Sequence, residues 1–159
     1  MMAKVKSKNT KPELAIRSAL HRLGYRFRIH KKELPGCPDL VFPKYHAVVF
    51  VNGCFWHGHS CSLFKWPKSR PDFWRRKITQ NRKRDRSNSN KLLATGWRVC
   101  TVWECSVKNR SQADFTLVID NLVQWLLGSE PVKDISTSEA NAPKLTHEHS
   151  IQMTPPKND

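Results

Sequence analysis

The sequence lacks the features that would mark a membrane or exported protein. Its longest apolar run near the middle, AVVFV, is far too short to cross a bilayer. The basic stretch MMAKVKSKNTKPE at the amino end contains no apolar segment, which predicts that no signal peptide is present. Internal repeats are absent as well. We therefore expect a cytoplasmic protein with no membrane partner.

Acidic side chains are also scarce. The 159 residues include only 13 Asp and Glu against 28 Lys and Arg, which gives a formal net charge of +15. The excess lies within residues 1–128, which hold 25 basic and 8 acidic side chains. So basic a domain favours a polyanionic partner, and nucleic acid is the commonest one. The alternative, a charged surface that only keeps the protein soluble, usually mixes both signs.

Local patterns predict a single mixed α/β domain over residues 1–128, built around a short sheet. Residues 129–159 are rich in Ser, Thr, Pro, Asn and Glu, so we expect a disordered tail there. The predicted elements are a helix over 11–24 capped by Thr10, strands over 39–42 and 46–52 joined as a hairpin, an irregular loop over 53–69, a long basic helix over 71–95, a strand over 97–103 and an amphipathic helix over 113–128.

The five cysteines are an odd number, and without export signals they favour metal ligands or buried thiols over disulfides. Cys54, His59 and Cys61 offer three zinc ligands within eight residues of the predicted loop. Cys105, just past the last predicted strand, is the natural fourth ligand. The alternative is that each cysteine is a small buried apolar residue, which we prefer for Cys100. A closed four-ligand site would be structural.

Four side chains are candidates for the catalytic site in this basic domain. Asp39 begins a predicted strand, downstream of a helix that bears Glu13, and carboxylates are the ligands with which nucleases hold Mg²⁺. The next strand, VVFVN, supplies neither the acid nor the lysine of a usual restriction-type site, so His57 is the available base. Asp85, in the basic helix, could orient that histidine. The alternatives are a turn or cap role for Asp39 and an exposed ion pair with a neighbouring Arg for Asp85.

Five motifs together resemble one known family. KNTKPE, LPGCPDLVFPKY, FVNGCFWHGHSC, FWRRKI followed by N-x-x-R-D, and GWRVCTVWEC occur in the order found in very short patch repair (Vsr) DNA mismatch endonucleases. The resemblance covers residues 2–128. It implies a restriction-endonuclease-like fold with a PD-(D/E)xK-type core, a structural Zn²⁺ site and a catalytic Mg²⁺ ion. It also implies a bacterial, nucleoid-associated monomer that works with mismatch-repair factors and a repair polymerase.

The implied substrate is duplex DNA with a T:G mismatch left by deamination of 5-methylcytosine, nicked 5′ to the thymine to give 5′-phosphate and 3′-hydroxyl ends. By the resemblance, Asp39 and the backbone carbonyl of Val51 hold Mg²⁺, and Glu13 supports that site through water. His57 resembles the general base and Asp85 its carboxylate partner. The resemblance gives the zinc ligands as Cys54, His59, Cys61 and Cys105.

The resemblance also assigns DNA contacts. Three residues match aromatics that wedge into the base stack beside the mismatch: Phe55, Trp56 and Trp74. Opening the stack costs less free energy at a T:G wobble, because this pair stacks and pairs less well. The alternative for these three is core packing. Lys77 and Asn81 share the helical stripe of Trp74 and are expected to contact DNA.

One departure leaves other functions open. Asn52 stands where some relatives have a second active-site histidine. Together with the missing Asp/Glu-x-Lys, this departure suggests a zinc-stapled DNA-binding protein without catalysis. A restriction-like nuclease that cuts both strands of unmismatched DNA is the other alternative.

Overall fold

A computed structural model describes residues 8–137, which fold around one five-stranded sheet. The strands lie in chain order across the sheet. β1, β2 and β3 are antiparallel neighbours, whereas β3, β4 and β5 run parallel. Parallel neighbours need crossover connections, and helices α2 and α3 supply them. The strands are β1 (Arg28–Ile29), β2 (Leu40–Phe42), β3 (Ala47–Asn52), β4 (Arg98–Trp103) and β5 (Val132–Ile135).

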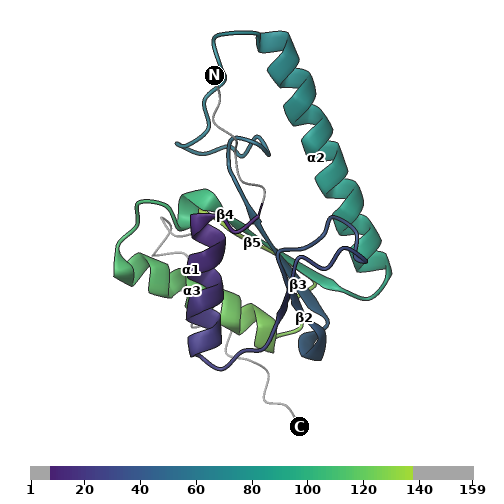
Figure 1. Ribbon diagram of the computed structural model, residues 1–159, viewed down its shortest axis with the longest axis vertical. Helices are drawn as coiled ribbons and strands as arrows, with labels where there is room; N and C mark the ends of the chain where they lie inside the picture. The colour runs from purple at the N-terminus through teal and green to yellow at the C-terminus, as the bar shows by residue number, and fades with distance from the viewer. Residues whose placement is uncertain (1–7, 138–159) are drawn as a thin grey trace.

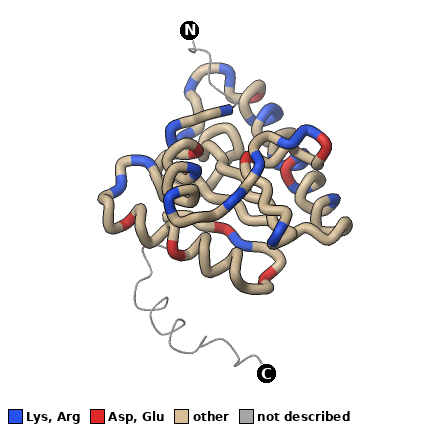
Figure 2. Tube along the Cα trace, turned by 60° about the horizontal axis from the view of Figure 1, so that its bottom comes forward, with Lys and Arg blue, Asp and Glu red and all other residues tan. Residues whose placement is uncertain are grey.

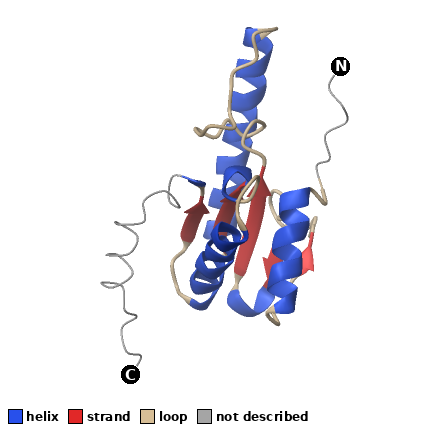
Figure 3. Cartoon of the chain, turned by 90° about the vertical axis from the view of Figure 1, so that its left-hand side faces the viewer, coloured by secondary structure: helices blue, strands red, loops and turns tan. Residues whose placement is uncertain are grey.

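Helices cover both faces of the sheet (Figure 3). Helices α1 (Lys11–Arg22) and α3 (Gln112–Leu127) lie on one face, and α2 (Pro71–Ala94) lies on the other. Side chains alternate between the faces along each strand, so Leu40 and Phe42 join the larger core with α1 and α3. Val41 faces the opposite side and packs in a small cluster with Leu92 of α2. The central strands of the sheet are thus buried on both sides.

Helix α2 is long and polar, and its amino-terminal half projects beyond the sheet (Figure 1). Its 24 residues include eight Lys and Arg and two Asp, and only Ile78, Asn81 and Leu92 are buried. Lys and Arg likewise occur at many places along the whole trace, and Asp and Glu at few (Figure 2). The loop over 53–69 runs beside the projecting half of α2. The amino-terminal half of α2 and the irregular loop therefore extend together beyond the carboxyl end of β3.

The helices and strands expected from the sequence are present, with Thr10 accepting a hydrogen bond from the Glu13 amide as the cap of α1. The β2–β3 hairpin turns through a short 3-10 helix, η1 (Pro43–Tyr45). A second, η2 (Glu104–Ser106), follows β4. Within the described part of the chain, no helix combines the length and the apolar character that a membrane span needs.

The predicted domain boundary at residue 128 is wrong. The sheet continues with β5, which pairs in parallel with β4 from Val99↔Val132 to Val102↔Ile135. β5 is an edge strand in which only Ile135 is buried, so its composition carries little of the apolar signal that predicts a strand. The described fold therefore extends to residue 137, and the rest of the predicted tail, 138–159, lies outside the described residues.

Candidate active site and metal centre

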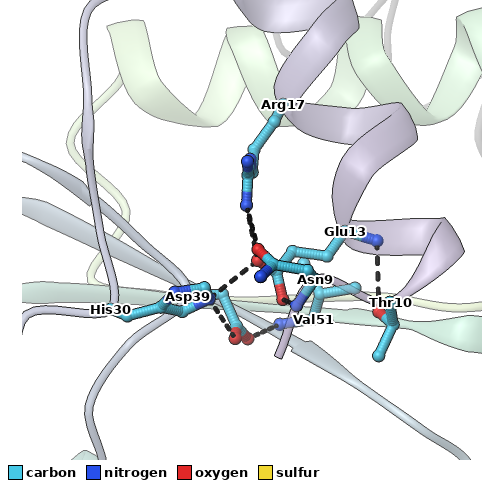
Figure 4. A network of polar contacts seen from close by, with 7 residues as sticks. All are labelled: Asn9, Thr10, Glu13, Arg17, His30, Asp39 and Val51. Carbon is cyan, nitrogen blue, oxygen red and sulfur yellow. Dashed lines mark hydrogen bonds and ion pairs between the residues drawn. The ribbon is translucent and has the colours of Figure 1, made fainter. Parts of the chain in front are cut away.

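A cavity of about 880 Å³ lies between the carboxyl end of β3, the loop that follows it and α2. Three of the four predicted catalytic side chains, Asp39, His57 and Asp85, line this cavity although they are far apart in the sequence. The fourth, Glu13, is buried in the first turn of α1 and lies beside Asp39 (Figure 4). The fold therefore brings the predicted catalytic residues to one place.

Asp39 precedes β2 and is held by the neighbouring strand. Its Oδ2 accepts a hydrogen bond of 2.7 Å from the Val51 amide, which leaves Oδ1 directed toward His30, 3.9 Å from Nε2 (Figure 4). Burial is the main cause that raises the pKa of Asp39 to about 7, and the Glu13 carboxylate raises it further, while the Val51 amide acts in the opposite direction. A bound cation would offset both the burial and the repulsion, so the residues present fit a divalent metal ion.

Glu13 is the centre of a polar network on α1. Its Oε2 lies 3.0 Å from Nη1 of Arg17 and 2.8 Å from Nε2 of His30, and its Oε1 accepts a hydrogen bond of 3.2 Å from the Asn9 amide. Arg17 follows Glu13 by one helical turn, so the pair is local. This network gives charged and hydrogen-bonding partners to a carboxylate that is only 1% exposed and lies next to the site.

His57 and Asp85 form the second polar pair of the cavity. Nδ1 of His57 contacts Oδ2 of Asp85 across the gap between the loop and α2. An Nδ1–H that donates to this carboxylate leaves Nε2 as a proton acceptor. This contact favours the orienting role of Asp85 over the exposed ion pair with a neighbouring Arg.

Helix α2 also fixes the backbone of the loop that carries His57. The Asn81 amide donates a hydrogen bond of 2.8 Å to the carbonyl of Trp56, and Arg82 donates to the carbonyls of His57 and Gly58. Gly58 has φ +61, and a Cβ there would lie 2.5 Å from Ile78. Only glycine permits this turn and this close approach, so α2 sets the position of the candidate base. Asn81 lines the cavity, as does Lys77, but the amide of Asn81 already holds the loop.

The four predicted zinc ligands converge next to the cavity. One ligand atom each from Cys54, His59, Cys61 and Cys105 lies within 4.8 Å of all the others. The Cys105 Sγ is 3.7 Å from His59 Nδ1, and ligands of one tetrahedral zinc ion are about 3.5 to 3.8 Å apart. Burial raises the pKa of the Cys54 thiol and lowers that of the His59 imidazole. Three sulfurs and a neutral imidazole are a donor set that could hold zinc.

Trp103 and η2 support this cluster from β4. The indole ring of Trp103 stacks on His59 with centroids 4.2 Å apart and meets His57 edge-on, and its Nε1 donates to Asp134 of β5. Cys105 reaches the loop because β3 and β4 are parallel and end at the same edge of the sheet. Cys100 lies within β4 and is buried in the larger core, as expected.

The predicted wedge residues form a cluster of their own. Phe55, Trp56 and Trp74 meet edge-on, with ring centroids 5.2 to 5.7 Å apart. All three are half-buried, and none belongs to the two apolar cores described for residues 8–137. Phe55 and Trp56 also line the cavity. The placement therefore disfavours core packing as their role.

His30 and Glu104 are among the cavity residues that were not predicted from the sequence. Glu104 Oε1 accepts a hydrogen bond of 3.4 Å from the backbone amide of Cys54, so it supports the loop that carries the Cys/His cluster. His30 follows the two-residue strand β1, and nothing in its local pattern distinguishes it from a loop histidine. Asn52 ends β3 and lines the same cavity.

Known proteins are similar in sequence to this chain. A model of the family described as DNA mismatch endonuclease Vsr matches residues 1–63. The DNA mismatch endonuclease Vsr of Escherichia coli (strain K12) is 38% identical over 136 residues, which cover 86% of this chain and 87% of that protein. This chain belongs to the Vsr family.

Other relatives of this Vsr-family protein are nicking enzymes by name. The type II nicking enzyme V.XorIIP of Xanthomonas oryzae pv. oryzae (strain KACC10331 / KXO85) is 55% identical over 69% of this chain and 80% of that protein. V.NmeAIP of Neisseria meningitidis serogroup A is 48% identical over 70% and 79% respectively. The class expected from the sequence, a nicking DNA endonuclease of mismatch repair, is therefore confirmed.

Proposed function

We propose that this Vsr-family protein nicks one strand of duplex DNA 5′ to the thymine of a T:G mismatch, in a Mg²⁺-dependent reaction that leaves a 5′-phosphate and a 3′-hydroxyl. The observation that carries the proposal is the shared cavity, in which Asp39 and the His57–Asp85 pair lie beside the Phe55–Trp56 aromatics. Catalytic groups and wedge are thus close enough to act on one nucleotide step. A restriction-endonuclease-like core is part of the proposal.

Asp39 and the backbone carbonyl of Val51 would hold the Mg²⁺ ion, with Glu13 in support. When bound, Mg²⁺ supplies positive charge that stabilises the phosphate and the leaving oxygen. His57 accepts the proton of the attacking water at Nε2, because Asp85 occupies the Nδ1 side and stabilises the imidazolium that forms. The buried charge network of Glu13 and Arg17 keeps this part of the cavity fixed.

The loop over 53–69 and helix α2 bind the mismatched DNA. The aromatics Phe55, Trp56 and Trp74 enter the base stack at the mismatch, where the T:G wobble is opened at less cost than a Watson–Crick pair. The basic residues of α2 neutralise phosphates, with Lys77 and Asn81 among the DNA contacts. Zinc held by Cys54, His59, Cys61 and Cys105 fastens the loop that bears both wedge and base, and has no part in the chemistry. The working form is a monomer, and its nicked product passes to mismatch-repair factors and a repair polymerase.

The experiment uses a supercoiled plasmid that carries a single T:G pair, and the same plasmid with T:A. We expect nicked circles from the T:G plasmid with Mg²⁺ and unchanged T:A plasmid. Linear product from both plasmids would replace the proposal with a restriction-like nuclease. Salt-sensitive binding with no product, with Mg²⁺ or Mn²⁺, would replace it with a non-catalytic DNA-binding protein.

A further inference from the structure

His30 lies where it can bind the same cation as Asp39. Its Nε2 atom is 2.8 Å from Oε2 of Glu13 and 3.9 Å from Oδ1 of Asp39 (Figure 4). One ligand atom from each of these three side chains lies within 4.8 Å of the other two. Ligands about 2.1 Å from one divalent ion are roughly 3 Å apart when adjacent and roughly 4 Å apart when opposite. The distances from Nε2 of His30 to Glu13 and to Asp39 are therefore in the range expected for ligands of a single ion.

Oδ1 of Asp39 is available to a metal ion, and Nε2 of His30 becomes available when it leaves Glu13. Asp39 uses Oδ2 to accept the Val51 amide, so Oδ1 is the oxygen that faces the ion. Glu13 has hydrogen bonds from Arg17 and from the Asn9 amide in addition to that of His30. Glu13 thus remains hydrogen-bonded when Nε2 of His30 turns from it to a metal ion, with the imidazole hydrogen on Nδ1.

The backbone at His30 supports a specific role for its side chain. His30 has φ +47, in the left-handed region, and its side chain is only 12% exposed. A residue other than glycine in this region costs on the order of 1 kcal/mol and persists where its surroundings hold it. Here the conformation turns the imidazole inward to the cavity, which His30 lines together with Asp39 and His57.

We propose that His30 is a direct ligand of the divalent metal ion held by Asp39, so that this chain has a mixed nitrogen–oxygen site. The inference rests on the proposed metal site at Asp39 and adds to it a ligand and a metal preference. Imidazole favours transition-metal ions, whereas Mg²⁺ prefers oxygen ligands in a regular octahedron. The site therefore binds Mn²⁺ more tightly, relative to Mg²⁺, than oxygen ligands alone would.

The test measures Mn²⁺ binding to the zinc-loaded protein without DNA, by titration and by pulsed electron paramagnetic resonance. We expect a ¹⁴N coupling from a bound imidazole in the wild type and in His57→Ala. His30→Gln can still donate a hydrogen bond to Glu13 but is a poor ligand, so it should lose the coupling. Its Kd for Mn²⁺ should rise about tenfold or more, since losing even a residue that only supports a metal ligand typically weakens metal binding about 10- to 100-fold. Its Kd for Mg²⁺ should rise at most about threefold.

Two variants complete the test. His46→Gln is the matched control, because His46 is also at φ +47 but lies at the opposite end of β3, and it should bind Mn²⁺ as the wild type does. Asp39→Asn should lose both metals. Bound Mn²⁺ without ¹⁴N coupling, or a coupling that survives in His30→Gln, overturns the role of His30 and leaves the proposed function intact. Equal metal binding by Asp39→Asn overturns the metal site itself, and the proposed function with it.

Discussion

Replacing Asp39 with Asn should stabilise the metal-free protein, although it removes the proposed metal ligand. The pKa of Asp39 is raised from 3.8 to about 7 because the carboxyl is buried beside Glu13. Between these two values the folded state holds a proton that the unfolded state has lost, so stability falls as pH rises from about 4 to about 7. Above pH 7 the full penalty remains. The neutral amide has no such penalty.

The magnitude follows from the shift. About three pH units at 1.36 kcal/mol each correspond to roughly 4 kcal/mol as an upper limit. The amide must find its own hydrogen bonds next to Glu13, so we expect an increase of about 1–3 kcal/mol in the free energy of unfolding at pH 8. For a chain of this size that is a rise in Tm of roughly 2–4 °C per kcal/mol.

The assay is thermal or urea unfolding at pH 5 and pH 8, in resin-treated buffer without a chelator so that zinc is retained. The gain of Asp39→Asn over wild type should be larger at pH 8 than at pH 5. Asp120→Asn, an exposed acid on α3, is the control and should change stability little. Added Mg²⁺ should stabilise the wild type and not Asp39→Asn. A variant less stable than the wild type at pH 8 without metal would show that the buried Asp39 carboxylate does not destabilise the fold.

Three further predictions concern the His57–Asp85 pair, the proposed zinc site and the aromatic residue Trp74. Asp85→Asn should lower the single-turnover nicking rate about 10²- to 10⁴-fold with DNA affinity nearly unchanged, because His57 loses the carboxylate that orients it; a rate equal to that of wild type would contradict this. Metal analysis should find about one zinc per chain, reduced in Cys61→Ser and retained in Cys37→Ser, and a folded protein free of zinc would exclude the structural site. Trp74→Ala should weaken binding to T:G duplex roughly 10- to 100-fold while T:A binding changes little, as a stacking loss of about 1–3 kcal/mol implies; equal losses on both duplexes would assign Trp74 to packing.

Those parts of the fold that rest on local patterns could be predicted from the sequence. The cap at Thr10 and the apolar spacing define α1, and the alternation of Val48 and Val49 defines a strand buried on both faces. The Cys/His cluster could also be predicted from the sequence, because three of its four side chains fall within eight residues. Cys105 needed only the rule that neighbouring parallel strands end at the same edge.

The features that were missed depend on long-range contacts. β5 is a short edge strand whose support comes from β4 and from the Trp103–Asp134 hydrogen bond, which no local pattern encodes. His30 gains its place only when α1 brings Glu13 to the turn before β2. A single histidine in a loop carries no spacing signal, so its partners had to be seen in three dimensions.

The most direct test of the central claim is the single-turnover nicking rate of strand-labelled oligonucleotide duplexes that differ only in one T:G or T:A pair. We expect Mg²⁺-dependent cleavage of the thymine strand alone, 5′ to the mismatched thymine, with the T:A duplex cut far more slowly and Asp39→Asn inactive on both. Equal rates on the two duplexes, or a nick that persists in Asp39→Asn, would contradict it.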